Sequence, residues 1–283
     1  MDPDIKLYIR GKFAKADGTD LDATDHTART NKFLHLLFIQ CTIALNGVNI
    51  TQSGDLYNYR AYLETILIYG NDAAKSHLTN SYWYKNAGHM LPCDPTKAES
   101  TNTGFIDRWN RQKQSKEIEM YGRIHSDLCN VIKFLLPGVR LQIKFMKAKP
   151  SSYLMNTKAD SMNIFKFLEA KLYVCRIKAY PSILLAYDNT LKTNLAYYDM
   201  TRVTLKTFTF TSGASSLSID QAVTGHLPKR LLFAMVDNSA FLGAINTNPY
   251  RFQDFGIRTY TRFVNGKQVP NETLLTPVMR RLA

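Results

Sequence analysis

The stretch NKFLHLLFIQCTIALNGVNI, residues 31–50, decides the fold class. Residues 33–45 are apolar and rich in strand-forming residues, and they end at Asn46-Gly47, a dipeptide typical of a two-residue hairpin turn. Residues 48–50 can return as the partner strand. We therefore predict a β-hairpin with Asn46 and Gly47 in its tight turn. His35, inside the apolar run, is expected to be a core histidine bonded to the backbone.

Strand patterns recur along the rest of the chain. In RLQIKFMK (140–147), Leu141, Ile143 and Phe145 share one face of a strand, so we expect these three side chains in the core. The opposite face of this strand is polar. Further segments with alternating or β-branched character are 5–14, 170–180, 201–211, 230–238 and 257–269.

Two segments have helical periodicity instead. Residues 123–136 are predicted to form a helix that Pro137-Gly138 ends, and residues 57–69 are predicted to form another. The second helix should bury one face against a sheet, with Trp83 nearby. The residues of that face are Tyr59, Tyr62, Leu63, Ile66 and Leu67.

Many strands and two short helices in the first half predict a mainly β fold of the sandwich or jelly-roll type. A flexible connection between two parts of the chain is expected at about residues 182–198. Pro228 and Pro249 are expected to mark chain reversals in the part that follows.

The chain is strongly basic, with a formal net charge of +13 over 283 residues. This charge favours a polyanionic neighbour such as nucleic acid, and a merely solvated basic surface is the alternative. Two strand faces carry candidate contacts to phosphate without sequence preference. These candidate residues are Arg140, Lys144, Arg258, Tyr260 and Arg262.

The chain carries no recognisable catalytic or cofactor motif: GxxxxGK[ST], GxGxxG and GxSxG do not occur in it. The nearest approach to a zinc set is His89, Cys93 and Asp94, for which a surface loop is the better interpretation. The letters of residues 125–127, His-Ser-Asp, fall in the predicted helix, where consecutive side chains point apart and cannot form a relay. We therefore expect no enzyme activity, no cofactor, no metal and no small-molecule substrate.

The sequence also lacks an apolar run of membrane-spanning length and a secretory signal pattern at its start. We therefore expect no membrane span. The four cysteines form no CxxC pair, which is typical of a reducing compartment. These features favour an intracellular protein.

Several segments, taken together and in order, resemble the major capsid proteins of Maverick/Polinton elements and related viruses, which occur as integrated copies in animal genomes. The resemblance covers nearly the whole chain. The segments that carry it are 31–50, 57–85, 102–111, 119–145, 225–252 and 264–270.

The resemblance implies a double jelly-roll, which is two adjacent β-sandwiches, in a structural protein of the virion capsid. Homotrimers of such proteins tile an icosahedral shell. Residues 1–185 are then the first sandwich without its leading strand, and residues 186–283 are an incomplete second sandwich, so this copy is expected to be shortened at both ends. The resemblance brings no cofactor or catalytic residue.

Two functions from different classes follow. The first is a capsid or capsid-derived protein that binds other copies of itself and packages DNA through non-specific electrostatics. The second is a basic module on a β-scaffold that binds nucleic acid without sequence preference.

Overall fold

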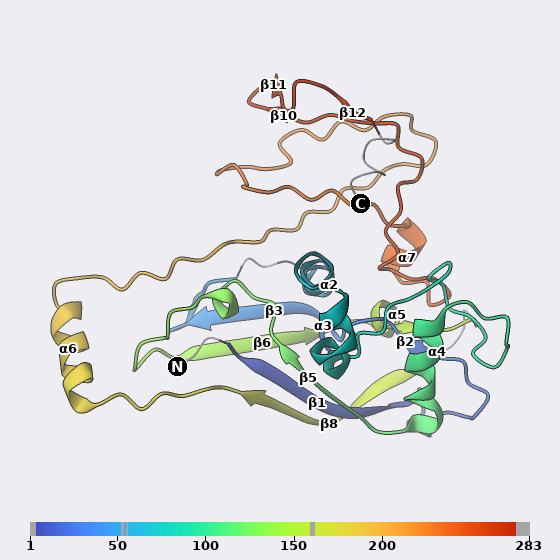
Figure 1. Ribbon diagram of the computed structural model, residues 1–283, viewed down its shortest axis with the longest axis horizontal. Helices are drawn as coiled ribbons and strands as arrows, with labels where there is room; N and C mark the ends of the chain where they lie inside the picture. The colour runs from blue at the N-terminus through green and yellow to red at the C-terminus, as the bar shows by residue number, and fades with distance from the viewer. Residues whose placement is uncertain (1–3, 52–53, 55, 159–161, 276–283) are drawn as a thin grey trace.

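The computed structural model describes residues 4–51, 54, 56–158 and 162–275. Its packed part is built on two three-stranded antiparallel sheets (Figure 1). The first sheet has the order β5 (Ile118–Arg123), β1 (Lys6–Ala14), β8 (Ile164–Tyr173). The second has the order β4 (Val48–Asn49), β3 (Phe38–Leu45), β6 (Leu141–Lys147), and a short pair joins β2 (Ala28–Arg29) to β7 (Leu154–Met155).

The hairpin predicted around residue 46 is confirmed, because β3 and β4 pair on either side of Asn46-Gly47. Both residues have positive φ, 49° for Asn46 and 83° for Gly47, as a tight turn of this kind requires. Asn46 also clamps the turn to the start of β6. Its N–H donates to the carbonyl oxygen of Arg140 at 2.9 Å, and its side-chain oxygen accepts from the N–H of Arg140 at 2.8 Å.

Aromatic rings fill the space between the two sheets. The Phe165 ring of β8 is 1% exposed and lies 5.2 Å from the Phe13 ring and 5.1 Å from the Phe33 ring, measured between centroids. Phe38 of β3 lies 6.3 Å from Phe167 of β8. Rings from both sheets therefore meet in one core, which makes this part a small sandwich.

Short helices cover the sandwich, and the longest confirms the helix predicted over 57–69. The α-helices of this part are α1 (Phe33–Leu36), α2 (Tyr57–Ile68), α3 (Asn71–Lys75), α4 (Thr103–Asn110) and α5 (Pro150–Tyr153). Single 3₁₀ turns are η1 (His77–Ser81), η2 (Lys113–Ser115) and η3 (Leu128–Asn130).

The predicted helix over 123–136 is wrong. Strand β5 runs up to Arg123, and the only helical element after it in this range is the three-residue turn η3. The side chains of His125 and Asp127 reach across to α2 instead. These long-range pairings override the local apolar spacing on which the prediction depended.

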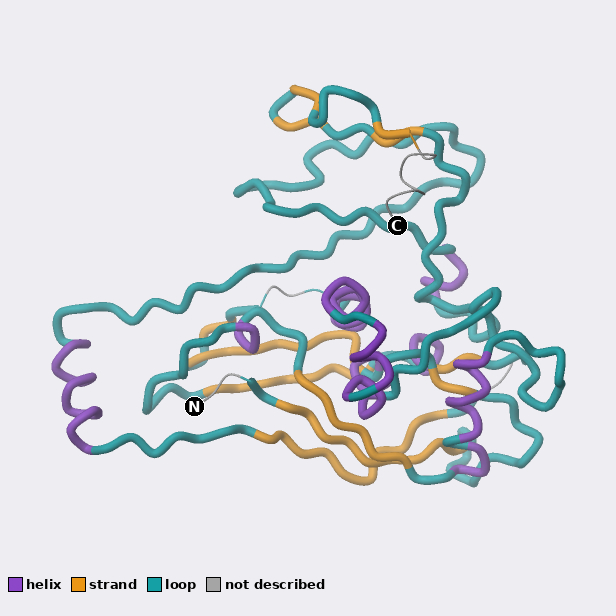
Figure 2. The backbone as a smooth tube through the Cα atoms, in the orientation of Figure 1, coloured by secondary structure: helices purple, strands orange, loops and turns teal. Residues whose placement is uncertain are grey.

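After β8 the chain leaves the packed part as a projecting arm (Figure 1). The tip of the arm is the helix α6 (Pro181–Leu191), where a flexible connection was expected. A long stretch without helix or strand follows (Figure 2). The last described elements are α7 (Asn238–Leu242) and two short strand pairs, β9 (Thr259–Tyr260) with β12 (Leu274–Leu275) and β10 (Phe263–Val264) with β11 (Lys267–Gln268).

Two strands predicted for the second part of the chain, residues 186–283, are wrong. Residues 201–211 form no strand, and 230–238 contribute only one bridge, between Val236 and Phe252. The strand predicted over 170–180 ends at Tyr173. A strand needs a neighbour to bond its N–H and C=O groups. Apart from that single bridge, no strand of the described part of the chain pairs with these segments. The structure thus has a mainly β, antiparallel fold whose sheets concentrate in the first half.

The core assignment predicts a large effect at Phe165. Replacing Phe165 with Ala should lower the free energy of unfolding by about 3–5 kcal/mol, because it opens a cavity among three other rings. Leu168→Ala, on the same strand but 41% exposed, should lower it by less than about 1 kcal/mol. Urea unfolding of both variants measures this difference. Equal losses would contradict the sandwich core.

Candidate functional site

The five residues predicted to contact nucleic acid do not converge. Arg140 and Lys144 are exposed beside and on β6, whereas the other three lie in the far part of the chain with β9 and β10 (Figure 1). Of these, Tyr260 is half-buried and its ring lies 5.2 Å from the ring of Phe233. Arg262 is also half-buried, and its Nε donates to the carbonyl oxygen of Val269 at 3.2 Å.

Arg258, the remaining member of that set, is exposed. It precedes β9 by one residue, while Arg262 precedes β10 by one residue. The predicted face therefore divides between two strand pairs. It does not form one continuous cationic strip.

The helix α2 buries a different face from the one its apolar residues predicted. Tyr59 and Tyr62 are buried, and Leu63 is half-buried, but Ile66 and Leu67 are 46% and 64% exposed. The expectation for the last two is wrong, because the final turn of α2 leaves their side chains exposed. The buried stripe follows the spacing i, i+3, i+4, i+7 and includes polar residues: it is Asn58, Ala61, Tyr62 and Thr65.

Aromatic contacts place α2 against the second part of the chain. Tyr62 lies 5.4 Å from Trp83 and 4.7 Å from Tyr250, between ring centroids. The Tyr59 hydroxyl donates to the carbonyl oxygen of Pro249 at 3.1 Å. Pro249 lies in a turn, whereas Pro228 lies in an irregular loop.

The apolar face of β6 is only partly covered. Leu141, Ile143 and Phe145 are half-buried and pack on the core, while the residues between them are exposed. The Phe145 ring lies 4.7 Å from that of Phe38. Side chains along β6 alternate between half-buried and exposed, as the sequence indicates, but the apolar ones are not fully buried.

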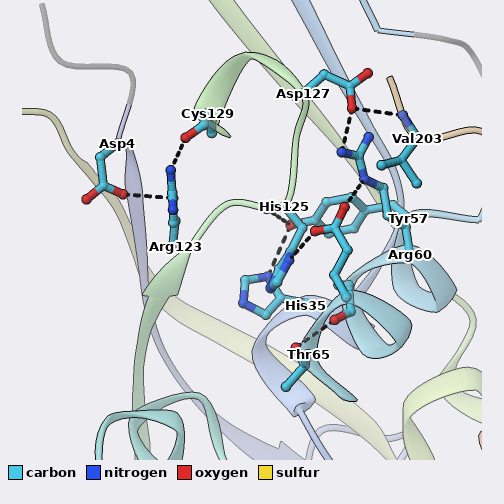
Figure 3. Close-up of polar contacts among 12 residues, drawn as sticks. Asp4, His35, Tyr57, Arg60, Thr65, Arg123, His125, Asp127, Cys129 and Val203 are labelled. Carbon is cyan, nitrogen blue, oxygen red and sulfur yellow. Dashed lines mark hydrogen bonds and ion pairs between the residues drawn. The ribbon is translucent and has the colours of Figure 1, made fainter. Parts of the chain in front are cut away.

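The most elaborate polar site is a buried charge network centred on α2, which Figure 3 shows. Arg60 Nε lies 2.8 Å from Glu64 Oε1, and an Arg60 Nη lies 2.6 Å from Asp127 Oδ1. His125 Nδ1 lies 2.7 Å from Glu64 Oε2. Asp127 Oδ1 also accepts from the backbone N–H of Val203 at 3.3 Å. The network therefore ties one helix to the segment after β5 and to the chain that returns from the arm.

His35 extends this network into the core. Its Nδ1 lies 3.1 Å from the Tyr57 hydroxyl, and its ring stands 4.6 Å from the His125 ring in an edge-to-face arrangement (Figure 3). The expected backbone partner is thus wrong, because the hydroxyl of α2 takes its place. His35 Nε2 is buried without a hydrogen-bond partner in the described part of the chain.

Burial and neighbouring charges shift the protonation equilibria of these groups. Burial, followed by the nearby His125 and Lys32, moves the pKa of His35 well below its ordinary value. Burial also lowers the pKa of His125, and the hydrogen bond to Glu64 only partly opposes it. Burial alone would raise the pKa of Glu64, but the bond from His125 and the charge of Arg60 outweigh it and lower that pKa. Both imidazoles are therefore neutral and the carboxylate is charged near neutral pH.

These bonds hold α2 against the segment after β5, and they place no side chain as a nucleophile. Residues 125 and 127 both reach α2 because their segment is extended rather than helical, so the predicted reason for excluding a relay is wrong. The exclusion itself has a different basis: the Ser126 hydroxyl is buried and has no hydrogen-bond partner in the described residues, so it does not contact His125. Sequence reasoning missed the network because Arg60 and Glu64 resemble an ordinary surface pair at i, i+4 spacing.

A second buried polar cluster surrounds Arg108 of α4. Its guanidinium donates to the carbonyl oxygens of Arg29 and Tyr84 and to the side chain of Asn86. Arg108 is fully buried, and burial lowers its pKa to about 10. Three carbonyl-type acceptors satisfy this cation where a carboxylate would be expected.

The described residues include no group of three or more His, Cys, Asp or Glu side chains arranged to hold a metal ion. His89 is exposed, and Asp94 lies 3.5 Å from His26 Nε2. In the same residues, no helix has both the length and the apolar character needed to cross a membrane.

Comparison with known proteins gives one weak relationship. No family model matches the chain, and no solved structure matches it. The chain is similar to the Caenorhabditis elegans protein described as "Uncharacterized protein F54H12.2", with 20% identity over 258 residues. The matched region covers 87% of this chain and 57% of the relative, so the chain spans a little over half of that protein's length. The printed description assigns no function.

The charge network predicts that acid destabilises the fold. The pKa values of His35 and His125 are lower in the folded chain than in the unfolded one, so the unfolded chain binds more protons and the free energy of unfolding should fall as pH drops from 7 to 5. The depressed pKa of Glu64 adds a loss at lower pH, because its stabilisation disappears as the carboxylate is protonated. Urea unfolding at several pH values measures this slope.

A His125→Gln variant should show a shallower slope between pH 7 and 5, since one buried titrating group is gone. His226→Gln, which changes an exposed histidine, is the matched control and should retain the slope of the unaltered protein. Identical slopes for all three proteins would contradict the assignment.

Proposed function

We propose that this chain is a capsid-type structural protein that acts by binding other copies of itself, and is not an enzyme. The observation that supports this proposal is the amount of large apolar side chain left exposed after β8. Monomeric proteins rarely expose contiguous apolar surface of this kind. The exposed residues between 177 and 233 include Ile177, Tyr180, Leu185, Leu195, Tyr197, Phe208, Phe210, Leu227, Leu232 and Phe233.

The arm helix α6 is the clearest example. None of its residues is buried, although Ile183, Leu184, Tyr187 and Leu191 share one face at helical spacing. An apolar helix face of this kind is stable in water only when another surface covers it. A neighbouring copy is the occupant that a shell-forming protein supplies.

The arm is anchored to the packed part at its return. Lys133 Nζ donates to the carbonyl oxygen of Tyr197 at 3.1 Å and lies 3.0 Å from Asp199 Oδ2. The Tyr198 hydroxyl donates to the carbonyl oxygen of Phe134 at 3.1 Å and accepts from the N–H of Leu136. These bonds give the projecting helix a defined direction, as a repeated contact in a lattice requires.

The proposal also covers the arrangement of the two sandwiches and of the copies in a shell. We infer a double jelly-roll, with residues 1–185 as the first sandwich and 186–283 as part of the second, in trimers that tile a virion shell. The six strands of the two packed sheets support the first sandwich. The resemblance to Maverick/Polinton capsid proteins supports the second, and segments such as 201–211, which form no strand in the described part of the chain, can pair with strands of another copy.

The proposal predicts that the arm controls assembly. Ile183→Lys places a charge on the apolar face of α6 and should shift the protein from trimers and larger assemblies to monomers in sedimentation velocity. Asn189→Lys adds the same charge to the opposite face and should leave assembly unchanged.

Negative-stain images of the unaltered protein should show trimers or shell fragments. A monodisperse monomer at all concentrations would overturn the capsid proposal. If both lysine variants still assemble, the arm does not control assembly and that part of the proposal would be wrong.

A further inference from the structure

An open hollow lies between α3, α4 and the segment that joins η1 to the rest of the chain. Its volume is about 770 Å³, within the range of small-molecule sites. The consecutive residues Tyr82, Trp83, Tyr84 and Lys85 all line it. A run of three aromatic residues and a lysine therefore contributes to the wall of one open space.

This aromatic segment is rigidly held. Asn31 Oδ1 accepts from the N–H of Tyr84 at 2.6 Å, and the buried Arg108 donates to the Tyr84 carbonyl oxygen. Gly104 lets α4 lie against the segment, since a Cβ at this position would come within 2.2 Å of the Lys85 carbonyl oxygen. Tyr82 has φ of 59°, a left-handed conformation that an aromatic residue rarely adopts. The backbone that carries the rings is thus held in place by the protein itself.

The cations around the hollow make no direct ion pair in the described residues. Lys75, Lys85 and Arg111 are exposed, and none of them takes part in an ion pair of the described residues. The guanidinium of Arg111 lies 4.9 Å from the centre of the Tyr84 ring. Two acidic residues, Asp107 and Glu119, also line the hollow.

A further, buried cation lies next to it. Arg29 is 0% exposed, and its three guanidinium nitrogens have no hydrogen-bond partner in the part of the chain that the structure describes. Its Cζ lies 3.6 Å from the centre of the Tyr82 ring. Burial lowers the pKa of Arg29 to about 9, so the group remains charged at neutral pH. An unpaired buried charge is costly to the fold and strengthens the positive potential beside the hollow.

We propose that this hollow binds single-stranded nucleic acid. A base would stack on the tyrosine rings at 82 and 84, and phosphates would bind Lys75, Lys85 and Arg111. Aromatic rings with arginines on them, beside exposed cations, are the features that such ligands need. Asp107 and Glu119 can accept hydrogen bonds from N–H groups of bases, the N3–H of thymine among them, a role that a phosphate-only site does not require. The site is distinct from the strand faces around Arg140 and Arg258.

Fluorescence anisotropy with a labelled oligothymidine and the full chain tests this site. The double variant Lys85→Gln/Arg111→Gln should bind about tenfold or more weakly. The slope of log K against the logarithm of the salt concentration should become less steep by roughly 1.4, the value for two lost phosphate contacts on a single strand. Arg140→Gln/Lys144→Gln removes the same charge from exposed positions of the sandwich and should alter affinity less than about twofold.

Equal losses in both double variants would overturn the site, because binding would then follow net charge alone. Undetectable binding by the unaltered protein at low salt would overturn it as well. An equal or greater affinity for a duplex of the same length would exclude stacking on the tyrosine rings.

Arg29→Met separates a binding role from a structural one. Methionine keeps apolar bulk beside Tyr82 but removes the unpaired charge, so Tm should rise while affinity for the oligothymidine falls. A fall in Tm with unchanged affinity would assign Arg29 to the fold alone and remove its charge from the proposal.

Discussion

The pairing of Arg60 and Glu64 with Asp127 and His125 is the interaction on which the arrangement of the chain depends. Burying charges to this extent is costly, and loss of one partner leaves another unpaired in a medium of low polarity. Here the guanidinium lies between two carboxylates, and Glu64 also bonds an imidazole. The helix α2 and the segment after β5 are therefore fixed together.

The same network reaches the second part of the chain through the bond between Asp127 and the N–H of Val203. Because residue 203 follows the arm, this bond and the contacts of Lys133 and Tyr198 fix where the arm leaves the sandwich. The physical consequence is a division of the molecule. The buried apolar core lies mostly in the first part, whereas the arm and the segments after it present apolar side chains outward.

That division gives a common basis for the two proposals. An anchored but uncovered arm is suited to contacts between copies, and the aromatic hollow lies on the packed part, away from the arm helix (Figure 1). Self-association and nucleic-acid binding would thus use separate surfaces. A shell protein needs both properties at once, since its copies contact one another while part of the surface meets the packaged strand.

Local signals in the sequence predicted the local structure. The Asn46-Gly47 turn and the alternation of 141–147 depend on neighbours in sequence, and both strands are present. The failures depend on distant partners. The spacing of Ile124 and Leu128 favours a helix, but His125 and Asp127 gain more by reaching α2.

The functional features were the least predictable for the same reason. Arg29 and Arg108 are fully buried, although arginine in a sequence indicates surface. The alternation of 201–211 indicates a strand, but a strand forms only where a partner strand is available. The hollow joins α3, α4 and the segment at 82–85, and sequence spacing does not show that these meet. Only the run of aromatic residues at 82–84 was a visible signal.

Hydrogen exchange followed by mass spectrometry tests the central claim most directly, namely that the second part of the chain completes its structure through other copies. Amides of β1 and β8 should be protected equally in dilute monomer and in assembled protein. Amides of 205–211, which follow the Val203 N–H that bonds Asp127, should exchange rapidly in the monomer and become protected on assembly. Protection of 205–211 that is the same at every protein concentration would contradict the account.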